Sequence, residues 1–222
     1  MIFTPATTAR QTPAPAIVLM HHRGGIDSFT RYAADRLATR GYLVAVPDLY
    51  HRCPDTVPLP DRKALLKDAE IVSDVETTVA QLHARADVAR DRIVIMGHCM
   101  GGRMALLAAG SMRAFCGAVI FYGGSVVKSW GEGETPFQRL RNITCPIIGF
   151  FGNEDRHPSP ADVDDMDAEL ASHGIPHEFH RYPGVGHGFQ NPAHDTPPER
   201  AAAEDAWTRT FEFLKRVAPG AE

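Results

Sequence analysis

The sequence lacks a long apolar run, a block of like charge and an obvious export signal. No stretch approaches the roughly 20 consecutive apolar residues that span a bilayer. The N-terminus has no charged segment followed by an apolar one, as a secretory signal would. The net charge is −4 and neither sign is concentrated in a block, which argues against binding to nucleic acid or to an anionic membrane. We therefore expect a cytoplasmic protein whose partner is a small molecule.

Cysteine, glycine and proline are also limited in number and placement. The four cysteines are far apart and form no C-x-x-C pair, so neither a zinc knuckle nor a thioredoxin-type motif is present, and we expect free thiols: Cys53, Cys99, Cys116 and Cys145. With 19 glycines and 17 prolines among 222 residues, the composition is neither collagen-like nor disordered. This length predicts a single domain over residues 1–222, with residues 1–15 as either a loose arm or a short edge strand, in a monomer or a small homo-oligomer.

Short apolar runs alternate with longer amphipathic ones, which predicts an α/β fold with a mostly parallel central sheet and helices on both faces. The expected strands are Ile17–Met20, Leu43–Pro47, Ile93–Gly97, Gly117–Tyr122, Ile147–Phe151 and Glu178–Tyr182. The expected helices are Phe29–Thr39, Arg62–Ala84, Gly101–Ala109, Asp162–Ser172 and Glu199–Val217. Two segments fit neither pattern, His51–Pro60 and Gly123–Arg139. Each follows the carboxyl end of a strand, so each is either a loop over a ligand site or a plain surface loop.

The segment Gly97-His98-Cys99-Met100-Gly101 leads from a buried strand directly into a helix. This G-x-C-x-G pattern is that of a nucleophile elbow, with cysteine in the position of serine. A Cβ at residue 97 or 101 would collide with the tight turn. The helix dipole and the unpaired N–H groups at the helix start favour the thiolate of Cys99, which is the reactive form.

A base and an orienting acid follow in the order that such an elbow requires. Asp155 comes after the strand that ends at Phe151, and His187, flanked by glycines, comes after the strand that ends at Tyr182. We expect His187 to take the thiol proton and Asp155 to fix its tautomer. Glu154 is the rival acid, with the turn favouring Asp155, and His157 is expected to be solvated.

Backbone N–H groups should form the oxyanion hole, namely those of Met100 and Arg23. Adjacent histidines on an extended chain point in opposite directions, so His21 and His22 do not indicate a metal site. The glycines after residue 97 do not match a dinucleotide fingerprint either. We therefore expect no metal and no cofactor.

With these residues in view, the chain resembles the dienelactone hydrolase (carboxymethylenebutenolidase) family of α/β-hydrolases. The resemblance extends from about Ile17 to Val217 and rests on the cysteine elbow, Val46-Pro47-Asp48-Leu49-Tyr50, Phe121-Tyr122-Gly123, Gly152-Asn153-Glu154-Asp155 and Gly186-His187-Gly188-Phe189. It implies the α/β-hydrolase fold and hydrolysis of a cyclic enol ester through a thioester on Cys99. Substrate-binding residues are expected at His22, Tyr122 and Trp130.

The sequence departs from the family pattern at two positions. His22 stands where the family usually has a glutamate that helps control the resting cysteine, so thiol activation should depend more on His187. The family's substrate-binding arginine after the catalytic histidine is absent, since Gln190-Asn191 follows Phe189. Arg23, Arg52 and Arg103 are the candidate replacements.

The sequence thus favours a cysteine hydrolase that opens a lactone or a small carboxylic ester through Cys99, His187 and Asp155. The alternatives are a broad carboxylesterase or cysteine peptidase of the same fold, and a non-catalytic member that binds a small molecule. The short loops leave little room for an extended peptide.

Overall fold

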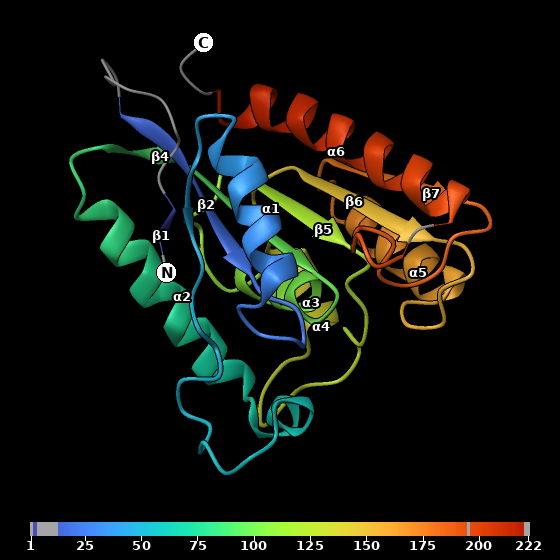
Figure 1. Ribbon diagram of the computed structural model, residues 1–222, viewed down its shortest axis with the longest axis horizontal. Coiled ribbons are helices and arrows are strands. Elements are labelled where there is room, and N and C mark those ends of the chain that lie inside the picture. The colour runs from blue at the N-terminus through green and yellow to red at the C-terminus, as the bar shows by residue number, and fades with distance from the viewer. Residues whose placement is uncertain (1, 4–12, 195, 220–222) are drawn as a thin grey trace.

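A single mixed sheet forms the centre of the molecule (Figure 1). The computed structural model describes residues 2–3, 13–194 and 196–219. In these residues seven strands lie in the order β1-β3-β2-β4-β5-β6-β7. The strands are β1 (Ile2–Phe3), β2 (Ala14–Met20), β3 (Leu43–Ala45), β4 (Val88–His98), β5 (Gly117–Phe121), β6 (Ile147–Gly152) and β7 (His177–Tyr182). Strand β1 pairs antiparallel with β3, and every other pair is parallel.

Helices cover both faces of the sheet, as the alternating pattern predicts. One face carries α1 (Ser28–Ala38) and α6 (Pro197–Val217), which pack on side chains such as Ile17 and Val94. The other face carries α2 (Asp68–His83), α3 (Met100–Ala109) and α5 (Pro160–Ser172), which pack on side chains such as Val18 and Ile95. Alternate residues of β2 and β4 thus enter opposite layers, because side chains alternate along a strand. Both layers are apolar, so these strands need no polar face.

Of the two alternatives for residues 1–15, the described part has the short edge strand β1, a seventh strand beyond the six expected, and the start of β2; residues 4–12 lie outside the described part. The structure corrects the sequence prediction at one helix. The expected helix Arg62–Ala84 is two elements, the 3₁₀ helix η1 (Leu59–Leu65) and α2. Leu66 and Lys67 between them have extended backbone, with ψ of 141° and 138°. Short helical turns α4 (Pro136–Arg139) and η2 (Leu140–Asn142) precede β6.

The parallel register brings the carboxyl ends of the central strands to one edge. Met20 pairs with Gly97, His98 with Phe121, and Gly152 with Tyr182. The segments that follow β2, β4, β6 and β7 therefore emerge side by side, which is where open α/β sheets place their ligand sites. No helix in the described part of the chain is both long and apolar enough to cross a bilayer.

Candidate active site

Cys99 lies at the sharp turn between β4 and α3, with φ of 56° and ψ of −120°. Positive φ is costly for a residue with a side chain, and such strain is a feature of functional turns. A Cβ on Gly97 would lie 2.1 Å from the carbonyl oxygen of Gly101, and one on Gly101 would lie 2.1 Å from that of Met20. The two glycines therefore permit the backbone crossings on which the turn depends.

Three side chains from separate strand ends form a continuous hydrogen-bonded chain. Nε2 of His187 lies 3.0 Å from Sγ of Cys99, and Nδ1 of His187 lies 2.6 Å from Oδ2 of Asp155. Asp155 is buried, and its other oxygen accepts the backbone N–H of His157 at 2.8 Å. Glu154 is exposed, so the carboxylate that meets the imidazole is that of Asp155.

Cys99 and His187 each favour the charged form of the other. Burial alone would raise the pKa of Cys99, but the hydrogen bond and charge of His187, the N–H of Met100 and the charge of Lys63 outweigh it, and the pKa is lowered. Burial likewise opposes protonation of His187, but the hydrogen bonds to Asp155 and Cys99 outweigh it and raise the pKa of His187 to about 10. The resting state that these shifts favour is a thiolate beside an imidazolium.

The buried ring of Tyr122 packs against the imidazole of His187. Its side chain is 1% exposed, and its ring lies edge-on to His187 with ring centroids 5.0 Å apart. The Tyr122 backbone also has positive φ, at 40°. This burial corrects the expectation that Tyr122 binds substrate, because the side chain has almost no free surface and packs against the imidazole instead.

The loop after β2 lies against the start of α3, where the oxyanion hole was expected. The hydroxyl of Tyr50 donates to the carbonyl of Arg23 at 3.0 Å and lies 3.7 Å from Sδ of Met100. Gly101 packs directly on the carbonyl oxygens of Met20 and His21. Arg23 and Met100 are thus linked through the hydroxyl of Tyr50.

His22 and Gln190, which stand at the two departures from the family pattern, both form defined contacts in the structure. His22 is paired with Asp27, with Nε2 and Oδ2 2.8 Å apart, and Asp27 also caps α1 by accepting the N–H of Thr30. Gln190 is buried and donates to the carbonyl of Ala203 in α6. His22 is thus engaged with a carboxylate, and Gln190 carries no charge.

A pocket of about 870 Å³ lies between the loop after β2, the η1 segment and the loop after β5; neither Cys99 nor His187 is among its lining residues. Trp130, which the sequence analysis proposes as a substrate-binding residue, is on its wall. Its lining includes four cations and one carboxylate: Arg23, Lys63, Lys67, Lys128 and Asp61. Lys63 is near enough to Cys99 for its charge to favour the thiolate. The pocket is therefore electropositive.

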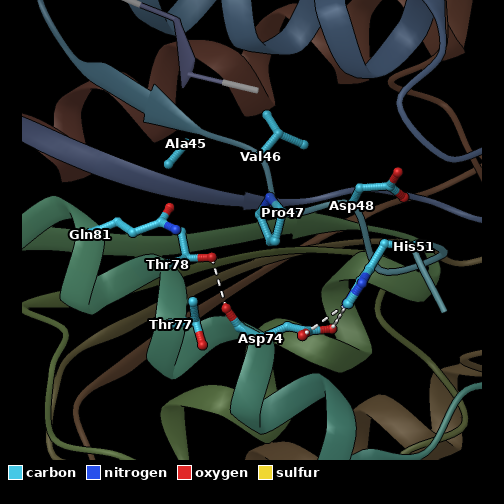
Figure 2. A pocket seen from close by; sticks show the side chains of 9 residues that line it. All are labelled: Ala45, Val46, Pro47, Asp48, His51, Asp74, Thr77, Thr78 and Gln81. Carbon is cyan, nitrogen blue, oxygen red and sulfur yellow. Dashed lines mark hydrogen bonds and ion pairs between the residues drawn. The ribbon is translucent and has the colours of Figure 1, made fainter.

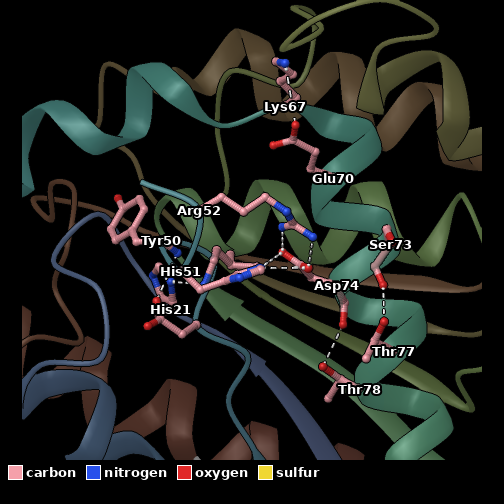
Figure 3. Close-up of polar contacts among 12 residues, drawn as sticks. His21, Tyr50, His51, Arg52, Lys67, Glu70, Ser73, Asp74, Thr77 and Thr78 are labelled. Atoms are coloured by element: carbon pink, nitrogen blue, oxygen red, sulfur yellow. Dashed lines mark hydrogen bonds and ion pairs between the residues drawn. The ribbon is translucent and has the colours of Figure 1, made fainter. Parts of the chain in front are cut away.

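Two of the three candidate arginines are engaged elsewhere. Arg103 is 1% exposed and forms a two-point ion pair with Asp68, so it does not reach a substrate. Arg52 forms a similar pair with Asp74 on the outside of α2 (Figure 3). Arg23 lines the pocket, although its guanidinium donates to the carbonyl of Pro60. Lys63 and Lys128 were not predicted as site residues, because nothing in their local pattern distinguishes them from other lysines.

A second, smaller hollow of about 310 Å³ lies between the end of β3 and α2 (Figure 2). Several of its polar groups are already engaged: the Asp74 carboxylate binds His51 and Arg52, and the Asp74 carbonyl accepts the hydroxyl of Thr78. Within the described ranges, no group of three or more histidine, cysteine or acidic side chains could hold a metal ion. All four cysteines are free thiols.

The mostly parallel sheet, the helices on its two faces and the nucleophile elbow define an α/β-hydrolase. The sequence profile of the dienelactone hydrolase family matches residues 2–218. The chain belongs to this family and is a hydrolase. It is 31% identical over 210 residues to the carboxymethylenebutenolidase of Rhodococcus opacus, covering 90% of this chain and 80% of that protein.

Solved structures agree on the fold. A Klebsiella pneumoniae protein provisionally assigned as a dienelactone hydrolase superposes with a TM-score of 0.86 at 24% identity, covering 96% of this chain and 90% of that one. Esterase 2 of Thermogutta terrifontis superposes with a TM-score of 0.78 at 21% identity, covering 100% of this chain and 90% of that one. At these identities the likeness extends to the fold alone.

Proposed function

We propose that this hydrolase opens a lactone or a small carboxylic ester through a thioester on Cys99. The observation that carries the proposal is the unbroken chain from Sγ of Cys99 through His187 to Asp155, with distances of 3.0 and 2.6 Å. The Cys99 thiolate attacks the carbonyl carbon, and the carbonyl oxygen becomes an oxyanion that the N–H groups of Met100 and Arg23 stabilise. Asp155 holds the imidazolium in the orientation needed for proton transfer.

The second half of the reaction uses the same imidazole. As the tetrahedral intermediate collapses, the bond between the carbonyl carbon and the ester oxygen breaks, and His187 gives its Nε2 proton to the leaving oxygen. For a lactone, the leaving alcohol or enol stays attached to the acyl group. His187, now neutral, removes a proton from water; the hydroxide attacks the thioester and restores the Cys99 thiolate with release of the acid.

The 870 Å³ pocket bears on the substrate class. Its cations outnumber its carboxylates. Within the part of the chain that the structure describes, Lys63 and Lys128 form no salt bridge, while Lys67 pairs with Glu70 at 3.6 Å. A buried or half-buried anion gains most from such a cluster. We therefore propose that the preferred ester carries an anionic group that points away from the scissile bond.

Single-turnover acyl transfer from an activated ester tests the assignment of the nucleophile. With para-nitrophenyl acetate, the wild-type protein should release a burst of para-nitrophenolate and carry an acetyl group on Cys99 that intact mass detects. Cys99→Ala should show neither, whereas Cys116→Ala, which removes a thiol remote from the site, should keep both. Acyl transfer by Cys99→Ala at the parent rate would rule out the mechanism. Tight lactone binding without turnover at any pH would instead favour the non-catalytic alternative.

A further inference from the structure

Arg103 is a buried charge that the proposed reaction does not use. It follows Cys99 by four positions, in the first turn of α3, and is 1% exposed. Its Nη1 and Nη2 donate to the two carboxylate oxygens of Asp68 at 2.7 and 3.0 Å. A buried ion needs a partner of opposite charge and hydrogen bonds on its remaining donors. The partner comes from α2, so this ion pair joins the helix of the nucleophile to a neighbouring helix.

The remaining donors of Arg103 hold the loop after β5. Nε donates to the carbonyl of Ser125 at 3.1 Å, and Nη2 donates to that of Lys128 at 2.6 Å. The guanidinium also lies over the ring of Trp130, 3.9 Å from its centroid. One side chain thus fixes three points of a single loop.

Asp68 holds the same loop from the other side. Its carboxylate accepts the backbone N–H of Trp130 at 2.9 Å, and its own backbone N–H donates to the carbonyl of Trp130 at 2.7 Å. Residues 123–135 have no helix or strand of their own, and Ser125 has a φ of 57°. Since the loop has no regular hydrogen bonding, its position depends on these contacts with Arg103 and Asp68.

The part of the loop that Arg103 and Asp68 hold is also a wall of the 870 Å³ pocket, through Lys128, Ser129, Trp130 and Gly131. We propose that Arg103 is a positioning residue that, together with Asp68, sets the place of this wall and thereby selects which esters reach Cys99. The inference rests on the proposed function. It concerns selectivity among substrates and leaves the chemistry at Cys99 to the elbow, His187 and Asp155.

The replacement Arg103→Lys tests the role of the guanidinium, because lysine keeps the charge but loses the two-point fork and the planar stack on Trp130. The measurement is kcat and KM for para-nitrophenyl acetate, for the benzoate ester and for the para-nitrophenyl half-ester of glutaric acid. We expect kcat/KM for the two larger esters, relative to the acetate, to change about tenfold, mainly through KM. The kcat for the acetate and the rate of Cys99 alkylation by iodoacetamide should stay within about twofold of the parent.

Arg52→Lys is the matched control. Arg52 pairs with Asp74 of the same helix α2 in the same two-point manner, at 2.6 and 2.7 Å (Figure 3). Unlike the loop that Arg103 holds, it does not line the 870 Å³ pocket. It should leave the relative kcat/KM of the three esters unchanged. A general loosening of α2 would instead affect both arginine variants.

Trp130→Ala keeps the test decisive if Arg103→Lys fails to fold, because it alters the wall directly at a half-buried loop residue. It should change the same ratios in the same direction. Adding Arg103→Lys to it should have little further effect on selectivity, since both changes act through one wall. Unchanged ratios in Trp130→Ala, or fully additive effects in the double variant, would overturn the inference. Activity in Cys99→Ala with every ester would overturn the proposed function instead, so the two failures are distinct.

Discussion

At the scale of single residues, the site depends on how Asp155 influences two coupled groups. Its carboxylate helps to raise the pKa of His187 to about 10, and the charged imidazole in turn helps to lower the pKa of Cys99. Neutralising Asp155 should therefore lower the pKa of His187 and raise that of Cys99. The thiolate would then form at a higher pH, and less of it would be present near neutrality.

Asp155→Asn should accordingly move the midpoint of the pH profile for Cys99 alkylation by iodoacetamide to higher pH. It should also lower kcat/KM for para-nitrophenyl acetate by a factor on the order of 10³–10⁴, as loss of the orienting acid does in related triads. Glu154→Gln is the control, because it neutralises the neighbouring exposed carboxylate and should leave both measurements unchanged. An unshifted alkylation midpoint in Asp155→Asn would show that Asp155 does not act on the thiol through His187.

His98, the residue before Cys99, affects the stability of the fold at low pH. It is 2% exposed and stacked on Phe121 with ring centroids 4.4 Å apart. Burial lowers the pKa of His98 to about 3. A histidine that is neutral in the folded state and has a pKa near 6.5 in the unfolded state binds more protons when unfolded, so its contribution to stability is lost as the pH falls below about 6.5.

His98→Phe should therefore reduce the acid sensitivity of folding. Between pH 7.5 and pH 5 the wild-type protein should lose about 2 kcal/mol more free energy of unfolding than the variant, from the proton linkage of this one residue. Urea denaturation at the two pH values measures the difference. Equal losses in the two proteins would mean that His98 is protonated in the folded state or that the acid sensitivity arises elsewhere.

At the scale of elements, the turn between β4 and α3 is the most constrained segment. Gly101→Ala would place a Cβ 2.1 Å from the carbonyl oxygen of Met20, which is backbone and cannot move aside easily. We expect the free energy of unfolding to fall by more than about 3 kcal/mol, at or beyond the upper end of ordinary overpacking. Gly186→Ala, beside His187, meets no atom within 4 Å and should change it by less than about 1 kcal/mol. Thermal or urea unfolding compares the two variants, and equal losses would contradict the close crossing of α3 with β2.

Local sequence could predict some of these elements and not others. The buried strands have continuous apolar runs and the elbow has glycines at fixed spacing, so the positions of both follow from local sequence. The break between η1 and α2 could not be found in this way. Asp68 begins α2 where its side chain meets Arg103, which is distant in sequence, and amphipathic spacing continues across the break. The sequence did contain one indication of this contact. Arg103 is the lone charge in the otherwise apolar helix Gly101–Ala109, and a buried arginine needs a carboxylate as its partner.

At the scale of the whole molecule, the charge of the pocket opposes that of the chain. The net charge is −4, yet Arg23, Lys63, Lys67 and Lys128 line the 870 Å³ pocket. An anionic ester is then drawn by a local field rather than by the overall charge, and that field weakens as salt shortens the Debye length from about 30 Å at 0.01 M to about 3 Å at 1 M. A neutral ester feels no such attraction.

Raising the ionic strength from 0.01 to 0.5 M should therefore lower kcat/KM for the para-nitrophenyl half-ester of glutaric acid several-fold, mainly by raising KM. The value for para-nitrophenyl acetate should stay nearly constant. Lys63→Gln should reproduce part of the loss at low salt and show a weaker salt dependence, because it removes the pocket cation whose charge acts on Cys99. Lys215→Gln, at the end of α6 and outside the pocket lining, is the control of equal charge change. If salt changes kcat/KM for the half-ester no more than that for the acetate, the pocket cations do not recruit the substrate. The proposal that the substrate carries an anionic group would then be wrong, whereas the proposed role of Cys99 would not be affected.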